Sequence, residues 1–295
     1  MIRRALLRRP SHLGLLAVLG AAVVAMLVFA PGAFADAFTP ESGGSPNADD
    51  VDTLYKLTLY IGIVIFLGVE GTLLYSLVKY RARRGGPEAE QIHGNTPLEI
   101  GWTVGAAAIL VVLTVVTFVY LPDIENPPAS GPNGLRADNT SFASIDQPEP
   151  PRSGGPILRI DVNGQQYLWR YDYRGGDTLY AYYEMVVPTD TTVVLHITSS
   201  DVQHSWWIPK LGGKADAVPG HVNETWFKIP AGREGRYFGQ CAELCGAGHA
   251  DMRAHVRAVT PAEFETWAEA QRRGIARSRE DLAAQRKRRE GSGGQ

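Results

Sequence analysis

The residues best suited to chemistry lie in one short stretch, CAELCGAGHADM, which runs from Cys241 to Met252. It combines two thiols, an imidazole, a thioether and carboxylates, a set of soft and borderline ligands that suits copper better than magnesium or calcium. Cys241 and Cys245 are separated by three residues, so a tight loop can direct both sulfurs into one small volume. Because a thiolate can bridge two metal ions, this spacing indicates a pair of metals.

Nitrogen ligands for two ions come from two parts of the chain. His249 lies four residues after Cys245 and Met252 three residues further, so they can give one ion a nitrogen and the other a weak axial sulfur. For the second ion the best candidate is His204, in DVQHSWW, since it ends a strand-like run and precedes large apolar residues that exclude water. Between the cysteines, Glu243 can offer its backbone carbonyl to copper and turn its carboxylate outward to another cation.

Two other chemistries fit part of this pattern. In an exported protein a Cys-x-x-x-Cys pair can form a disulfide, and two cysteines with two histidines can hold a structural zinc ion. Zinc has no use for a thioether, and a disulfide has none for His204, His249 or Met252. Copper therefore explains more of these residues than either alternative.

Together these residues resemble the copper A motif of cytochrome c oxidase subunit II, Cys-x-Glu-x-Cys-Gly-x-x-His-x-x-Met with a distant His in Asp-Val-x-His-Ser. The matching positions are His204, Cys241, Glu243, Cys245, His249 and Met252. The resemblance extends from about Asp52 to Trp267. It implies a cupredoxin-like domain with two copper ions, which passes electrons from cytochrome c to haem in subunit I. There, oxygen is reduced to water and protons are pumped.

The same resemblance assigns roles to further residues. It implies that Glu243 also helps to bind magnesium at the interface with subunit I. Glu99 matches a glutamate near the mouth of a proton-uptake path, the alternative being a charge that merely marks the end of a helix. In the family a tryptophan receives the electron from cytochrome c, and that position is Tyr167 here. Either Tyr167 substitutes, or Trp169 takes over, or the donor docks differently.

The elements that position the loop begin with an export signal. Residues 1–35 contain four arginines and an apolar run, and they end in Ala33-Phe34-Ala35, the form of a signal peptidase site. We expect a signal peptide cleaved after Ala35, with an uncleaved membrane anchor as the alternative. Residues 36–52 are rich in Gly, Ser, Pro and Asp, a composition that predicts a flexible lead-in.

A transmembrane helical hairpin is predicted over residues 53–122, with helices at about 54–78 and 98–121. Each apolar segment has about the 20 residues needed to cross a bilayer. The basic sequence KYRARR after the first helix marks its cytoplasmic side. The stretch from Cys241 to Met252, called the copper loop below, therefore lies on the outer face of a bacterial-type plasma membrane. Glu70 falls inside the first helix. A charge facing lipid there costs at least ~2.5 kcal/mol, so we expect Glu70 to face a protein partner or to be protonated.

The remaining chain is predicted to form a linker, an all-β domain and a C-terminal helix. Residues 123–155 are crowded with Pro and Gly and indicate a linker. Residues 156–260 contain short runs rich in Ile, Val, Tyr and Trp, typical of an antiparallel sandwich or Greek-key barrel with the copper ligands on loops at one end. Residues 261–295 are read as a helix followed by a charged tail.

Composition narrows the class of protein further. The two cysteines of the loop are the only ones, which leaves no disulfide framework and no Cys-x-x-Cys-His haem attachment site. We expect subunit I, other oxidase subunits, membrane lipid and cytochrome c or an equivalent donor as partners, and no nucleic acid. The chain holds no catalytic residue of its own, so it would be an enzyme only as part of the oxidase. The alternatives are a membrane-anchored copper-binding module for assembly or storage, and the copper A subunit of a nitric oxide reductase.

Overall fold

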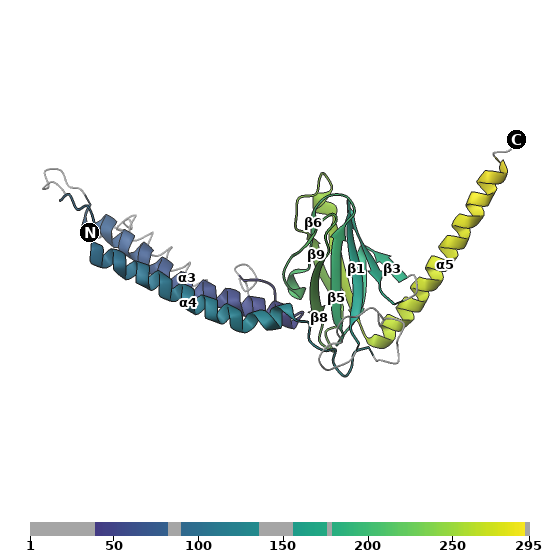
Figure 1. Ribbon diagram of the computed structural model, residues 1–295, viewed down its shortest axis with the longest axis horizontal. Helices are drawn as coiled ribbons and strands as arrows, with labels where there is room; N and C mark the ends of the chain where they lie inside the picture. Colours follow the sequence, from purple (N-terminus) through teal and green to yellow (C-terminus); the bar gives the residue numbers. More distant parts are fainter. Residues whose placement is uncertain (1–38, 82–89, 136–155, 176–178, 293–295) are drawn as a thin grey trace, which may run out of the picture. The chain divides into compact units, whose positions relative to one another are not determined.

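The computed structural model describes residues 39–81, 90–135, 156–175 and 179–292. The expected signal segment 1–35 and the part of the linker from 136 to 155 lie outside these residues. Two long helices come first, α3 (Pro46–Lys79) and α4 (Thr96–Glu125). They lie side by side as an antiparallel pair (Figure 1). Both are long and apolar enough to cross a membrane.

Helix α3 begins well before its apolar segment. Ser45 is the N-cap residue, Pro46 occupies the first turn and Asp49 adds a negative charge there. Proline at the first helical position and an acidic residue in the first turn both favour a helix start. Residues 46–52, expected to be part of a flexible lead-in, are therefore helical.

Helix α4 begins with a reciprocal pair of hydrogen bonds. The side chain of Asn95 accepts from the backbone N–H of Leu98 at 3.2 Å, and the carboxylate of Glu99 accepts from the backbone N–H of Asn95 at 3.0 Å. This arrangement resembles a capping box. Glu99 thus helps to stabilise the start of the helix, whatever further role it has.

Two five-stranded sheets follow and pack face to face as a sandwich (Figure 1). One has the order β3-β2-β1-β5-β8 and the other β4-β10-β9-β6-β7. The strands are β1 (Leu158–Gln165), β2 (Leu168–Tyr173), β3 (Leu179–Tyr182), β4 (Glu184–Pro188), β5 (Thr192–Ser199), β6 (His204–Trp207), β7 (Ala215–Ala217), β8 (Asn223–Lys228), β9 (Gly235–Cys241) and β10 (Arg253–Val259). Short 3₁₀ helices span Pro209–Leu211 and His249–Asp251.

The fold class expected from the sequence is confirmed, with two differences in detail. The sheets are mixed rather than antiparallel, because β1 pairs with β5 and β4 pairs with β10 in parallel. Strands β6 and β7 have no counterpart in the predicted runs, since they are only four and three residues long. His204 is consequently the first residue of β6 and not part of a loop.

The core lies between the two sheets and is filled by inward-facing aromatic and aliphatic side chains. Trp169, Tyr171, Phe227 and Met252 are among the largest side chains that are fully buried. Met252 and the two cysteines belong to this same core cluster. The candidate ligands are therefore held by core packing, which limits how far they can move.

Part of the predicted linker packs against the sandwich. Leu135 is buried in the core, and its backbone N–H donates to the hydroxyl of Thr191 at 2.9 Å. Ser130 is also buried: its hydroxyl donates to the carbonyl of Pro156 at 2.7 Å and accepts from the backbone N–H of Thr192 at 2.9 Å. Side-chain to backbone hydrogen bonds thus fix a segment that composition alone suggests is loose.

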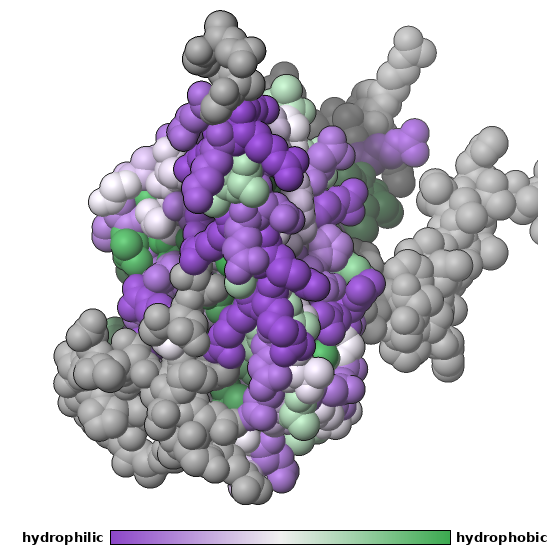
Figure 2. All heavy atoms as spheres, turned by 90° about the vertical axis from the view of Figure 1, so that its right-hand side faces the viewer, coloured by the Kyte–Doolittle hydropathy of each residue, from purple (hydrophilic) through white to green (hydrophobic). Residues whose placement is uncertain are grey.

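Helix α5 (Pro261–Ser292) starts on the sandwich and continues beyond it. Phe264 and Ala268 are fully buried, Ile275 is the last buried residue, and residues 276–290 are exposed. The charged tail is therefore helical throughout its described length. Figure 2, which faces the side of the molecule where α5 ends, shows a surface made mostly of hydrophilic residues.

Candidate metal centre

The candidate ligands come together because β6 and β9 are neighbours in one sheet. Trp206 pairs with Cys241, so His204 at the start of β6 lies close to the end of β9. The chain then turns through the 242–252 loop into β10. A hydrogen bond of 2.9 Å from the backbone N–H of Cys241 to the carbonyl of Met252 closes this loop.

The two sulfurs form the middle of the donor set. Cys241 Sγ and Cys245 Sγ lie 3.9 Å apart, and both cysteines are free thiols. His204 Nδ1 is 3.9 Å from Cys241 Sγ, whereas His249 Nδ1 is 3.7 Å from Cys245 Sγ. Met252 Sδ lies 3.8 Å from Cys245 Sγ. Each thiol thus lies next to a different imidazole, and Cys245 also lies next to the thioether of Met252.

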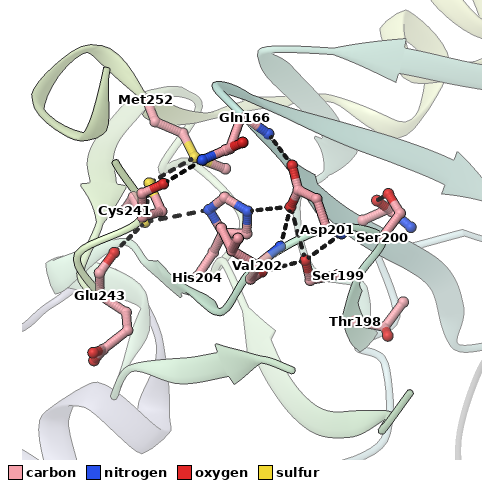
Figure 3. Close-up of polar contacts among 12 residues, drawn as sticks. Gln166, Thr198, Ser199, Ser200, Asp201, Val202, His204, Cys241, Glu243 and Met252 are labelled. Carbon is pink, nitrogen blue, oxygen red and sulfur yellow. Dashed lines mark hydrogen bonds and ion pairs between the residues drawn. The ribbon is translucent and has the colours of Figure 1, made fainter. Parts of the chain in front are cut away.

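The backbone of Glu243 points into the centre and its side chain does not. Its carbonyl oxygen accepts from Cys241 Sγ at 3.2 Å, while the carboxylate is directed away from the sulfurs (Figure 3). This geometry fits a carbonyl ligand on the inside and leaves the carboxylate available to a cation outside the pocket.

The donor set fits copper chemistry. His204, Cys241 and Cys245 are buried, and their donor atoms all lie within 4.8 Å of one another. His249 lies outside that group. Thiolate, imidazole and thioether are ligands that copper accepts.

Asp201 holds His204 from the side opposite the sulfurs (Figure 3). Its Oδ1 is 2.8 Å from His204 Nε2. Burial opposes ionisation of Asp201, but hydrogen bonds from His204 and from the backbone N–H groups of Gln166 and Val202 outweigh it and lower its pKa to about 2. An ionised Asp201 accepts the Nε2 proton, and this leaves His204 Nδ1 free to bind a metal.

The turn before β2 holds the copper loop in place. Gln166 Nε2 donates to the carbonyl of Cys245 at 2.6 Å. A Cβ added at Gly246 or Gly248 would come within 2.6 Å or 2.5 Å of Tyr167, so only glycine fits at these contacts. Burial, followed by the effect of Cys241, raises the pKa of the Cys245 thiol to about 11. A bound metal ion would have to displace that proton.

Tyr167 and Trp169 occupy different environments. Tyr167 is partly exposed and packs on the copper loop, whereas Trp169 has an exposure of 0%. The ring of Trp169 meets that of His204 edge-on, with centroids 5.9 Å apart. Trp169 therefore has no surface to present to a docked protein, and Tyr167 does.

Sequence reasoning did not recognise Asp201 and Gln166 as parts of this centre. An acid three positions before a candidate ligand histidine is a signal for a carboxylate that orients it, and Asp201 carries that signal. Gln166 gives no such signal. Its contact with Cys245 joins segments 79 residues apart, and only the fold reveals it.

The comparisons with known proteins bear on both the helical pair and the β domain. Residues 35–119 match the family described as cytochrome C oxidase subunit II, transmembrane domain, and residues 177–259 match the periplasmic domain of the same subunit. Cytochrome c oxidase subunit 2 of Thermostichus vulcanus is 34% identical over 252 residues, which cover 76% of this chain and 75% of that protein. The chain belongs to the cytochrome c oxidase subunit II family. It is thus a membrane protein with an outer-face β domain.

Other similar proteins cover the chain to different extents. Cytochrome c oxidase subunit 2 of Alkalihalophilus pseudofirmus is 32% identical over 241 residues, or 81% of this chain and 64% of that protein. The chain therefore spans somewhat less than two thirds of that relative. The solved periplasmic domain of subunit II of cytochrome oxidase from Bradyrhizobium japonicum is 35% identical and covers 40% of this chain and 94% of the solved one, with a TM-score of 0.38.

Proposed function

We propose that this chain is the electron-accepting subunit of a respiratory cytochrome c oxidase and that it holds two copper ions in a copper A centre. The copper ligands are His204, Cys241, Glu243 through its carbonyl, Cys245, His249 and Met252. The centre accepts electrons from cytochrome c and passes them to haem in subunit I. Oxygen is reduced to water there, and the reduction is coupled to proton pumping.

One observation carries this proposal: each of the two adjacent, buried thiols lies next to its own imidazole. Two copper ions held by these ligands would supply a one-electron carrier. The protein's own contribution is to fix the ligands. Asp201 orients His204, Gln166 binds the loop carbonyl at Cys245, and the core encloses Met252.

Electrons are proposed to enter through Tyr167. Its partial exposure and its contact with the loop at Gly246 and Gly248 support this role, whereas Trp169 is fully buried and meets the His204 ring edge-on. Tyr167→Ala should slow reduction by cytochrome c in stopped-flow measurements, and Tyr167→Phe should retain most of the rate. Equal rates in the two variants and the unmodified protein would place the electron path elsewhere.

The side chains of Glu243 and Glu99 are proposed to act together with subunit I. We propose that the outward carboxylate of Glu243 contributes to a magnesium site shared with subunit I, and that Glu99 lies near the mouth of the proton-uptake path. Glu99→Gln should slow proton-coupled turnover of the assembled oxidase without altering its copper content. Unchanged turnover would leave Glu99 with its helix-capping role alone.

The copper centre is tested on the full chain purified in detergent. We expect two coppers per chain and an electron paramagnetic resonance spectrum in which one unpaired electron is shared by two copper nuclei. Cys245→Ser should abolish this spectrum while the β domain stays folded by circular dichroism. One copper per chain, or a folded protein with a Cys241 to Cys245 disulfide and no copper, would instead support a copper-handling or structural role.

A further inference from the structure

The outward side chains of two neighbouring strands, β9 and β10, form a surface that the proposed electron transfer does not use. Side chains alternate along a strand, and the buried positions on these two strands fix which ones face outward. Cross-strand pairing places them in three rows. This arginine–phenylalanine face consists of Arg236, Phe238, Gln240, Arg253, His255 and Arg257.

Phe238 is the centre of this face. Its side chain is 63% exposed, although it lies in the interior of a strand. It pairs directly with His255, and the two rings meet edge-on at 5.2 Å with an interplanar angle of 85°. A single exposed aromatic ring is ordinary on a protein surface. What distinguishes Phe238 is that it is held by a neighbouring ring and surrounded by arginines.

The arginines of this face are not neutralised by the chain's own carboxylates. Arg236 and Arg257 are directly paired across the strands, an arrangement of like charges that is unfavourable by itself. They share a single carboxylate, Glu184, at 3.2 Å and 2.9 Å. The exposed Arg253 side chain makes no hydrogen bond or ion pair with any residue that the structure describes. Three guanidinium groups thus face one carboxylate.

We propose that the arginine–phenylalanine face is a docking surface for a protein partner that presents an apolar pocket surrounded by carboxylates. Arginine and aromatic residues are the types enriched at the centres of protein interfaces. Guanidinium groups bind carboxylates with two parallel hydrogen bonds, and the excess positive charge repels a basic surface. Since Arg253 directly follows Met252, the partner sits next to the candidate metal centre. The proposal does not depend on the metal being copper.

The contact is tested by photo-crosslinking in the native membrane. A photoreactive phenylalanine analogue replaces Phe238 in the full chain, and the same analogue at Tyr182 is the matched control. Tyr182 is 44% exposed and lies on β3, in the other sheet. We expect a crosslink from position 238, absent from position 182, to a peptide of a different chain with Asp or Glu residues beside the attachment site.

Charge variants show whether the arginines direct this contact. Arg253→Glu should lower the crosslinking yield roughly tenfold or more, whereas Arg253→Lys should retain most of it. Arg236 lies at the end of the face away from Met252. If the effect of Arg253→Glu does not come from a disturbed copper loop, Arg236→Glu should also lower the crosslinking yield. Unchanged yields in both glutamate variants would overturn the proposal. So would crosslinks from position 238 that reach only lipid or a second copy of this chain.

Discussion

At the scale of single residues, Asp201 determines which nitrogen of His204 faces the sulfurs. It accepts a hydrogen bond from Nε2 at 2.8 Å and so leaves Nδ1 toward Cys241. Residues that orient a metal-binding histidine in this way are typically worth 10–100-fold in metal affinity.

We expect Asp201→Ala to weaken copper binding by roughly 10–100-fold, because the imidazole of His204 loses its fixed orientation. Competition with a copper chelator measures the affinity. Asp216→Ala is the matched control, since Asp216 lies on the neighbouring strand and contacts Gln203 rather than His204. An affinity as high in the Asp201 variant as in the control would mean that core packing alone orients His204.

His196 makes the stability of the sandwich dependent on pH. Its ring lies between Asp161 and Glu224, with Nε2 3.1 Å from the Glu224 carboxylate. Burial is the main cause that lowers its pKa from the ordinary value of 6.5, with Arg174 and Arg159 acting in the same direction against the two carboxylates. The unfolded chain therefore takes up a proton on His196 more readily than the folded one.

The contribution of neutral His196 to stability is present above about pH 6.5 and is lost as the pH falls toward the lower pKa of the folded state. Chemical denaturation of the full chain in detergent, followed by tryptophan fluorescence between about pH 5 and 7.5, measures this loss. In the His196→Gln variant, the part of this loss of stability that is due to His196 should be absent. Parallel pH profiles for the two proteins would contradict the assignment.

At the scale of elements, helix α5 divides into a packed half and a free half. Phe264 is fully buried, and its ring lies 6.1 Å from that of Tyr173 and 5.6 Å from that of Trp267. Beyond Ile275 the described side chains are exposed. The stability of the β domain should therefore depend on the first turns alone.

We expect Phe264→Ala to destabilise the β domain by about 3–5 kcal/mol, the usual cost of removing a large aromatic side chain from a core. Removal of residues 279–295 should change its melting temperature very little, because residues 279–290 are exposed. Thermal unfolding of both variants makes the comparison. A large loss of stability on truncation would show that the distal half of α5 packs against the domain.

The sequence predicts an element well where its pattern is long and lies in one stretch of the chain. It predicts an element poorly where contacts between distant segments determine its structure. The helices α3 and α4 are visible from the length of their apolar runs, and most strands of the sandwich are visible from their short runs of aromatic and β-branched residues. Strand β6 is not, because four residues carry too little pattern, yet it supplies His204. The segment around Ser130 is rich in turn-forming residues, and its hydrogen bonds to Pro156 and Thr192 appear only in the folded chain.

The same distinction applies to the candidate metal centre. The spacing from Cys241 to Met252 predicts the ligand loop because all of its residues lie within one short stretch of sequence. The support from Gln166 comes from a distant segment that meets the loop only in the folded chain, and Asp201 acts on His204, which the pairing of β6 with β9 brings to the loop. The burial of Trp169 also follows from sheet packing, and alternation along a strand does not reveal which aromatic remains accessible.

At the scale of the whole molecule, the distribution of charge predicts how the chain crosses the membrane. Lys79 ends α3 and Arg81 follows it, and further arginines occur at positions 83 and 84, whereas the last turn of α4 has no basic residue. Basic residues next to a membrane-spanning helix are retained on the cytoplasmic side. The connection between the helices should therefore lie inside the cell and the β domain outside.

An epitope inserted between residues 82 and 89 should be protected from protease added to intact spheroplasts, while an epitope at the C-terminus should be digested. Disruption of the membrane must expose both epitopes, which serves as the control. The opposite pattern would invert the topology and place the candidate metal centre in the cytoplasm.

The contact of Tyr167 with the two glycines of the copper loop has a consequence for protein engineering. The loop is not a cassette that can be moved by itself to another β sandwich, because an aromatic ring almost 80 positions earlier in the chain fills the space above Gly246 and Gly248. A functional transplant would have to carry the Gln166–Tyr167 turn along with it. In natural variation the two segments should change together, as one inherited module made of two separate pieces of sequence.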